Sequence, residues 1–209
     1  MLITAVKPIL NQLRYIEKFI IIDNGHQNIK IETQKVITII TKENLGVAGS
    51  WNLGIAYAFE HLPEITHVLA CQDDCAFGTT QIPEILEYIG NHMDKWFMVG
   101  AYYWAVWAIS REGAKAMAYD KNKVFDDKFF PAYFEDNDFH WRIRQIDESK
   151  YIGSVSQMAP EICVNSGTLE RDPTINSTFD DLKLYYLKKW GGAPGLEKYK
   201  YAFNKKPAK

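Results

Sequence analysis

The chain has 209 residues, of which 47% are hydrophobic and 24% charged, a balance typical of one folded domain with a substantial core. Its net charge of −2 lacks the basic excess of a nucleic-acid surface, so we expect no nucleic-acid partner. The three cysteines form no disulfide framework, and neither a signal-peptide pattern nor a membrane-spanning apolar run is present. These features predict a soluble protein in the cytoplasm, without a transmembrane segment.

Short apolar runs alternate with helical segments in the first half of the chain. β-Branched runs predict strands at 2–6, 19–23, 36–41 and 67–74, and helical spacing predicts helices at 49–62 and 80–93. Apolar strands separated by helices indicate an α/β fold with a mostly parallel, buried sheet. Ligands of such sheets bind beyond the carboxyl ends of the strands, where the sequence places Lys7, Asp23, Asn24, Asn44, Asp73 and Asp74.

The second half of the chain is richer in aromatic residues. We expect strands within 97–110, a helix at 111–119 and an aromatic loop that runs into a helix over 125–146. An amphipathic helix is predicted at 178–190, stopped by Gly191 and Gly192, and a loose basic tail follows at 198–209. No linker interrupts this order, so residues 1–209 form one domain.

Several polar residues suggest ligand chemistry, although each also has a plain structural interpretation. Asp73 and Asp74 follow an apolar strand, and carboxylates there can hold Mg²⁺ or Mn²⁺ or simply form a solvated turn. Asp23 and Asn24 precede a glycine, which is also a common turn signal. The stretch containing Asn44, Gly46, Gly49 and Asn52 opens a helix and can present backbone N–H groups to an anion.

Three acids lie together before the helix of the second half. Glu135, Asp136 and Asp138 fall in its first turn, where the helix dipole favours an ionised carboxylate. Capping of the helix explains one of these acids well and three less well. Asp138 and Arg142 are four residues apart and can pair on one helix face.

Four segments together resemble the family 2 glycosyltransferases of the GT-A fold. They are "FIIIDNG", "ENLGVAGSWNLGIAYA", "HVLACQDD" and "FFPAYFEDNDFHWRIR", which occur in the family's order over residues 19–144. The resemblance implies a Rossmann-like, mixed but mostly parallel sheet flanked by helices. It also implies a nucleotide-binding half at 1–95 and an acceptor and catalytic half at 96–197, before the tail at 198–209.

The same resemblance implies an inverting transfer of a sugar from a nucleotide-sugar, with UDP as the expected nucleotide, to a hydroxyl acceptor. Asp136 is then the general base, with Glu135 as the second choice, and Asp74 is the ligand of Mn²⁺ or Mg²⁺. The donor contacts expected are Asp23, Asn24, Asn44, Gly49, Asn52 and Asp73. Asp138 and Arg142 would orient the acids, and Trp104 is a candidate for the acceptor side.

Two departures from the family pattern leave alternatives open. Many relatives carry a late His that completes the metal site, whereas the comparable segment here has Asn165. Asn165 is then a neutral ligand, or the diphosphate and carboxylate act alone. The usual polar contact after the first strand falls on Thr4 or Lys7, and the sequence does not choose between them.

Other functions and partners also stay open at this level. A non-catalytic domain that binds nucleotide or glycan keeps the same sheet but needs no base. A nucleotidyltransferase would resemble a Gly-rich, Arg-containing loop after the first strand, which "AVKPILNQ" lacks. The acceptor can be a glycan, a lipid-linked molecule or a protein, and the Lys-rich tail can touch acidic lipid at a membrane surface.

Overall fold

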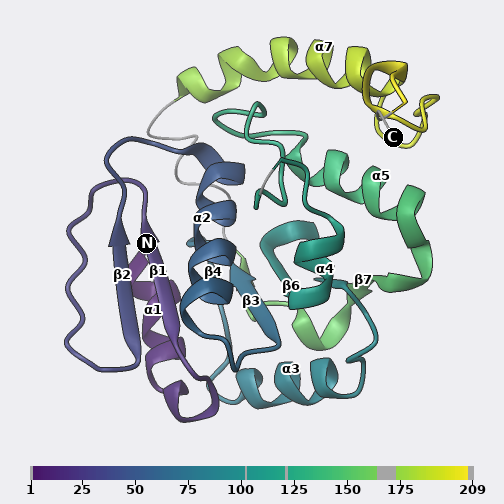
Figure 1. The fold of residues 1–209 in the computed structure, drawn as a ribbon. Helices are drawn as coiled ribbons and strands as arrows, with labels where there is room; N and C mark the ends of the chain where they lie inside the picture. The colour runs from purple at the N-terminus through teal and green to yellow at the C-terminus, as the bar shows by residue number, and fades with distance from the viewer. Residues whose placement is uncertain (1, 102, 121, 164–172, 207–209) are drawn as a thin grey trace.

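The computed structural model describes residues 2–101, 103–120, 122–163 and 173–206 and has a mixed α/β fold (Figure 1). The described helices are α1 (Leu2–Leu10), α2 (Gly46–His61), α3 (Gln81–Gly90), α4 (Arg111–Ala116), α5 (Glu135–Asp147) and α7 (Phe179–Trp190). The described strands are β1 (Phe19–Asp23), β2 (Val36–Ile40), β3 (His67–Cys71), β4 (Cys75–Ala76), β5 (Phe97–Gly100), β6 (Val106–Ser110), β7 (Tyr151–Val155) and β8 (Ile162–Cys163).

The strands are divided between separate sheets, so the prediction of one mostly parallel sheet is wrong. β1 and β2 form a parallel pair, and a mixed sheet has the order β3-β6-β5-β7. In that sheet β6 is antiparallel to both β3 and β5, whereas β5 and β7 are parallel. Only five residues connect β5 to β6, and a parallel connection needs a crossover of a dozen or more residues.

The expected strand at 2–6 is also wrong, because these residues begin α1. A short apolar run fits a strand or a buried helix equally well, and only its continuation decides between them. Here Val6 and Ile9 are both buried, which is the spacing of one helix face. Thr4 and Lys7 therefore lie within α1 and do not follow a strand.

A buried glutamine joins the end of α1 to the start of α3. Gln12 Nε2 donates to the carbonyls of Pro8 (3.1 Å) and Gly78 (2.8 Å). Its Oε1 accepts from the backbone N–H of Ile82 at 2.9 Å. One side chain thus satisfies backbone groups of two elements that are far apart in sequence.

The mixed sheet has a hydrophobic cluster on each face. Along β6, Trp107 and Ile109 join one cluster, whereas Val106 and Ala108 join the other, as the alternation of side chains along a strand requires. α2 and α5 cover the first face and α3 covers the second, an arrangement visible in Figure 1. The β1–β2 pair lies outside this sheet and connects to it through α2, which contacts both β1 and β3.

α7 crosses the top of the molecule and ends where the sequence predicts (Figure 1). Gly191 has a left-handed backbone (φ 74°), and its N–H donates to Leu187 O at 2.8 Å. The segment after it is not loose as far as residue 206, because the N–H groups of Lys198 and Tyr199 both donate to Trp190 O. Residues 207–209 lie outside the described part of the chain.

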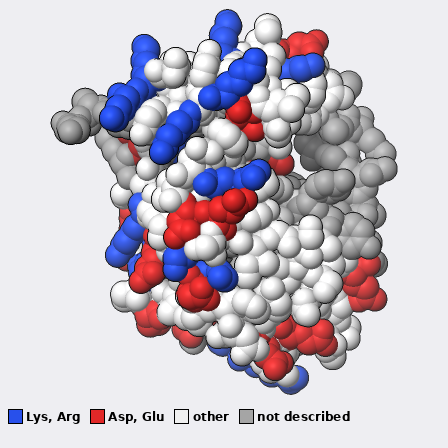
Figure 2. All heavy atoms as spheres, turned by 90° about the vertical axis from the view of Figure 1, so that its right-hand side faces the viewer, with Lys and Arg blue, Asp and Glu red and all other residues white. Residues whose placement is uncertain are grey.

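Figure 2 shows the face that carries α5, the end of α7 and the C-terminal segment, where Lys and Arg side chains gather in the upper part.

Within the described residues, no helix combines the length and the apolar character needed to cross a bilayer.

We expect Phe97→Ala to lower the free energy of unfolding by about 3–5 kcal/mol, because Phe97 is fully buried among the aromatic rings of the first cluster. Ile40→Ala is the matched control, since Ile40 is 55% exposed and should change stability by about 0.5 kcal/mol or less. Urea denaturation followed by circular dichroism measures both. Equal stability of the two variants would contradict the placement of the core.

Candidate functional site

A large cavity of about 1650 Å³ lies between the β1–β2 pair and the mixed sheet. Its walls include the carboxyl ends of β1 and β3, the start of α2 and the loop that leads into α5. Most of the site residues predicted from the sequence line it, namely Asp23, Asn24, Asn44, Asp73, Asp74, Trp104, Glu135 and Asp136. Residues that are 113 positions apart in the sequence therefore face one space.

Asp23 ends β1 with a buried carboxylate that is only half satisfied. It is 2% exposed, and its Oδ1 accepts from the backbone N–H of Gln27 at 2.8 Å. Oδ2 has no hydrogen-bond partner among the described residues. Buried acceptor atoms in proteins are almost always hydrogen-bonded. An N–H or O–H group of a ligand in the cavity can donate the missing hydrogen bond to Asp23 Oδ2.

Asn24 and Asn44 join the end of β1 to the start of α2. Asn24 Nδ2 donates to Asn44 Oδ1 at 2.8 Å, and Asn24 Oδ1 accepts from the N–H of Leu45 at 2.8 Å. Asn44 Oδ1 also accepts from the N–H of Gly46 at 2.9 Å. Both side chains line the cavity, and most of their hydrogen bonds are made to each other and to the backbone at the start of α2.

Gly46 allows the loop before α5 to approach the start of α2. Its φ is 68°, and a Cβ atom there would lie 2.6 Å from the carbonyl oxygen of Pro131. That same carbonyl accepts from the N–H of Val47 at 2.8 Å. Only glycine permits this contact, which brings the acid-bearing loop to the cavity.

Gly49 and Asn52 lie elsewhere, beside a separate pocket of about 500 Å³. Asn52 Oδ1 accepts from the N–H groups of Val124 and Phe125, both at 2.9 Å, and its Nδ2 donates to Phe125 O at 2.9 Å. The predicted donor contact at Asn52 is thus used to hold the chain before α5. Neither residue is part of the large cavity's wall.

Asp73 and Asp74 form the turn between β3 and β4. Burial raises the pKa of Asp74, and the neighbouring charge of Asp73 raises it further, although a hydrogen bond from Cys75 Sγ (3.5 Å) opposes this. A divalent cation would relieve both costs, and carboxylate oxygens are its preferred ligands. The described residues contain no group of three or more His, Cys, Asp or Glu suited to a metal, and Asn165 lies outside them.

Glu135 and Asp136 occupy the first turn of α5, where Phe134 rather than an acid is the N-cap. Glu135 is buried, and its Oε2 has no partner among the described residues. Burial and the charge of Asp136 raise the pKa of Glu135 to about 8. Burial also raises the pKa of Asp136, although Oδ1 accepts from the N–H of Asn137 at 2.7 Å. Burial thus favours the protonated form of both acids, and most strongly that of Glu135, whose pKa lies above neutral pH.

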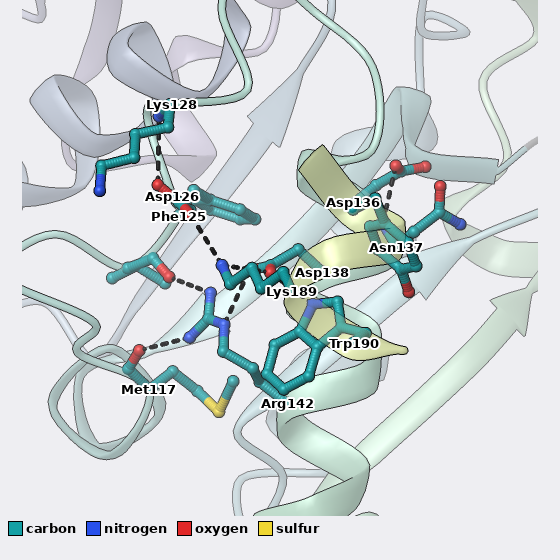
Figure 3. A network of polar contacts seen from close by, with 12 residues as sticks. Met117, Phe125, Asp126, Lys128, Asp136, Asn137, Asp138, Arg142, Lys189 and Trp190 are labelled. Atoms are coloured by element: carbon teal, nitrogen blue, oxygen red, sulfur yellow. Dashed lines mark hydrogen bonds and ion pairs between the residues drawn. The ribbon is translucent and has the colours of Figure 1, made fainter. Parts of the chain in front are cut away.

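Asp138 and Arg142 form the predicted pair, with Arg142 Nε 2.9 Å from Asp138 Oδ2 (Figure 3). Arg142 also donates to the carbonyls of Met117 (2.9 Å) and Val124 (2.6 Å). Asp138 Oδ1 accepts from Trp190 Nε1 at 2.9 Å. Asp138 is fully buried, so this arrangement fixes α5, and the acids that line the cavity are Glu135 and Asp136 in the same turn.

Lys189 lies at the centre of this network, fully buried between two carboxylates (Figure 3). Its Nζ is 2.6 Å from Asp126 Oδ2 and 2.5 Å from Asp138 Oδ1. Tyr185 OH also donates to Asp126 Oδ2, at 2.9 Å. Burial alone would raise the pKa of Asp126, but the Lys189 ammonium, together with hydrogen bonds from the Lys128 N–H and Tyr185 OH, holds this pKa below its usual range.

Asp126 and Lys189 are not among the residues predicted from the sequence. One available signal was the position of Lys189 on the apolar face of α7, with Leu182 and Tyr186. A lysine on such a face is rarely buried unless an acid pairs with it.

Trp104 both lines the cavity and packs against the core. Its ring stacks on Trp51, with centroids 6.3 Å apart and 22° between the planes. It also meets Phe139 and Phe125 edge-on. Part of its surface is therefore committed to packing, and the rest faces the cavity.

Comparison of the chain with known protein families, with curated proteins and with solved structures found no match.

We expect Lys189→Met to lower the free energy of unfolding by about 3–5 kcal/mol, because it leaves buried Asp126 without its cation and Asp138 with Arg142 alone. Lys188→Met, at the exposed neighbouring position, should change it by about 0.5 kcal/mol or less. Urea denaturation of both variants gives the comparison. A Lys189→Met protein as stable as Lys188→Met would rule out the buried network.

The raised pKa of Glu135 predicts a pH-dependent stability. The folded state keeps this proton between the ordinary pKa of 4.5 and about 8, whereas the unfolded state releases it. Stability should therefore fall as pH rises from about 5 to 8 and level off above. Glu135→Gln should flatten this fall, and denaturation of both proteins at pH 5, 6.5 and 8 measures it. An equally steep fall in the variant would assign it to other groups.

Proposed function

We propose that this chain is an inverting glycosyltransferase that binds a nucleotide-sugar in the large cavity and transfers the sugar to a hydroxyl acceptor. The observation that carries the proposal is the Glu135–Asp136 pair, which opens into the same cavity as Asp23 and the Asp73–Asp74 turn. The cavity wall thus includes a candidate base at the start of α5, a hydrogen-bond acceptor for a nucleotide at the end of β1, and carboxylate ligands for a cation after β3.

In this proposal the nucleotide binds at the end of β1. The unpartnered Oδ2 of Asp23 accepts a hydrogen bond from the ring N–H of uracil or from a ribose hydroxyl. Asn24 and Asn44 lie beside it on the cavity wall. The ring N–H of uracil is one donor that fits this buried acceptor, and UDP is the nucleotide we propose.

In the same proposal the diphosphate binds near the Asp73–Asp74 turn, which follows β3. Asp73 and Asp74 would hold Mg²⁺ or Mn²⁺, whose remaining ligands are phosphate oxygens and water, as Mg²⁺ commonly arranges. When bound, the cation offsets the negative charge that the diphosphate gains as the sugar leaves.

Asp136 takes the proton of the acceptor hydroxyl as that oxygen attacks the anomeric carbon. The bond between this carbon and the diphosphate oxygen breaks, its electron pair leaves with the diphosphate, and attack from the opposite face inverts the centre. Burial raises the pKa of Asp136, which makes it a stronger base than an exposed aspartate. Glu135 holds a proton at neutral pH and so leaves Asp136 as the anion of the pair.

The Asp73–Asp74 turn favours a second candidate, a domain that binds nucleotide or glycan without turnover. Within the described residues no third His, Cys, Asp or Glu joins these two carboxylates in a group that could hold a cation. Such a domain would use Asp23 but would have no need of the Glu135–Asp136 pair.

The first experiment is a thermal-shift panel of nucleoside diphosphates with and without Mn²⁺. UDP at a hundredfold excess over Kd should raise Tm by roughly 5–10 °C, because ligand binding to the folded state contributes about 2.7 kcal/mol. Asp74→Ala should abolish the part of the shift that depends on Mn²⁺. A folded protein that responds to no nucleotide would contradict the proposed transferase and leave the non-catalytic binding domain as the better candidate.

Turnover separates the two candidates. UDP release from UDP-sugars should fall about 10²–10⁴-fold in Asp136→Asn, while the thermal shift by UDP is retained. Asn137→Ala is the matched control, because it changes the neighbouring side chain at the same cavity and leaves both carboxylates. Nucleotide binding without turnover of any donor by the unchanged protein would favour the binding domain.

A further inference from the structure

The charges of the chain are unevenly distributed along it. Residues 182–209 contain eight lysines and one glutamate, whereas residues 1–181 contain 16 basic and 25 acidic residues. The C-terminal part is thus cationic on an otherwise acidic protein. Figure 2 shows Lys and Arg side chains gathered in the upper part of the face that carries the end of α7.

Six of these lysines are exposed, and we call this surface the lysine face. It comprises Lys183, Lys188, Lys198, Lys200, Lys205 and Lys206. Within the described part of the chain, none of the six forms an ion pair with a carboxylate. Glu197, the acid among them, instead accepts from Tyr186 OH and from the N–H of Gly195. The positive charge is therefore available to an external anion.

Large apolar side chains lie between the lysines and are also exposed. Leu184, Leu196 and Phe203 are 52%, 72% and 40% exposed. On α7, Lys183, Leu184 and Lys188 share the outer face, because the opposite face packs into the protein through Leu182, Tyr186, Lys189 and Trp190. Leu196 and Phe203 follow in the segment that folds back on Trp190.

We propose that the lysine face docks on an anionic membrane surface. Lysines attract the negative headgroups, and the interleaved leucine and phenylalanine side chains enter the boundary between headgroups and acyl chains. A nucleic-acid backbone would use the lysines but would leave Leu184 and Leu196 exposed, so the lipid surface fits both features. This docking does not depend on the proposed reaction.

Co-sedimentation of the full chain with vesicles tests the proposal. The protein should bind vesicles of phosphatidylcholine with about one-quarter phosphatidylglycerol, and should not bind pure phosphatidylcholine vesicles. The triple variant Lys198→Glu, Lys200→Glu, Lys205→Glu should lose roughly hundredfold in partitioning, about fivefold or more per lysine. Raising the salt from about 0.05 M to 0.5 M should release the unchanged protein, because screening weakens exposed charges.

A control with the same change in net charge is available elsewhere on the surface. Lys30→Glu, Lys42→Glu, Lys115→Glu alters three exposed lysines outside the lysine face and should leave vesicle binding within about twofold. Leu196→Ser should weaken binding even at unchanged charge, which a purely ionic contact would not show. Thermal unfolding of each variant confirms that it folds.

Three outcomes would overturn the proposal. They are no binding to anionic vesicles, equal loss of binding in the two triple variants, and binding to a single-stranded RNA homopolymer in place of vesicles. The last would assign the face to nucleic acid. Because nucleotide thermal shifts report the cavity independently, failure of membrane docking leaves the proposed reaction standing, and the reverse also holds.

Discussion

The buried contact of Lys189 with Asp126 and Asp138 holds three segments of the second half of the chain together. Lys189 belongs to α7, Asp138 to α5, and Asp126 to the chain between α4 and α5, so one ammonium fixes three segments. Burying these charges is costly unless each is paired, which makes the arrangement specific. The position of the first turn of α5, and with it the cavity wall, follows from this contact.

The acids of α5 divide into two kinds within a single turn. Asp138 is saturated by a lysine, an arginine and a tryptophan N–H, and it contributes to architecture. Glu135, three residues earlier, has a buried oxygen without a partner and a raised pKa of about 8. Position in the sequence does not distinguish a structural acid from one suited to chemistry. The number of hydrogen-bond and ion-pair partners of each carboxylate does. Unpaired acids beside a cavity are the ones suited to proton transfer.

Local pattern predicted the helices and strands well where their length and period were clear, as in α2, α3 and α7. It failed at α1, because the five residues 2–6, four of them apolar, carry no period that separates helix from strand. Local pattern also did not predict how the strands pair. The antiparallel direction of β6 follows from the short connection between β5 and β6, and not from the residues of β6 itself. Among the candidate site residues, Asn52 and Asp138 carry polar groups that could bind a ligand. In the tertiary structure, however, Asn52 bonds the backbone of Val124 and Phe125, and Asp138 pairs with Lys189.

The separation of β1–β2 from the mixed sheet has a mechanical consequence. Between β1 and β3 no ladder of backbone hydrogen bonds is present in the described structure, and α2 bridges them by side-chain packing. Packed surfaces slide by small shear movements at little cost, whereas a hydrogen-bonded ladder must break to move. Asp23 and Asp74, one at the end of β1 and the other just after β3, therefore belong to two bodies whose spacing a bound ligand can adjust without disrupting either sheet.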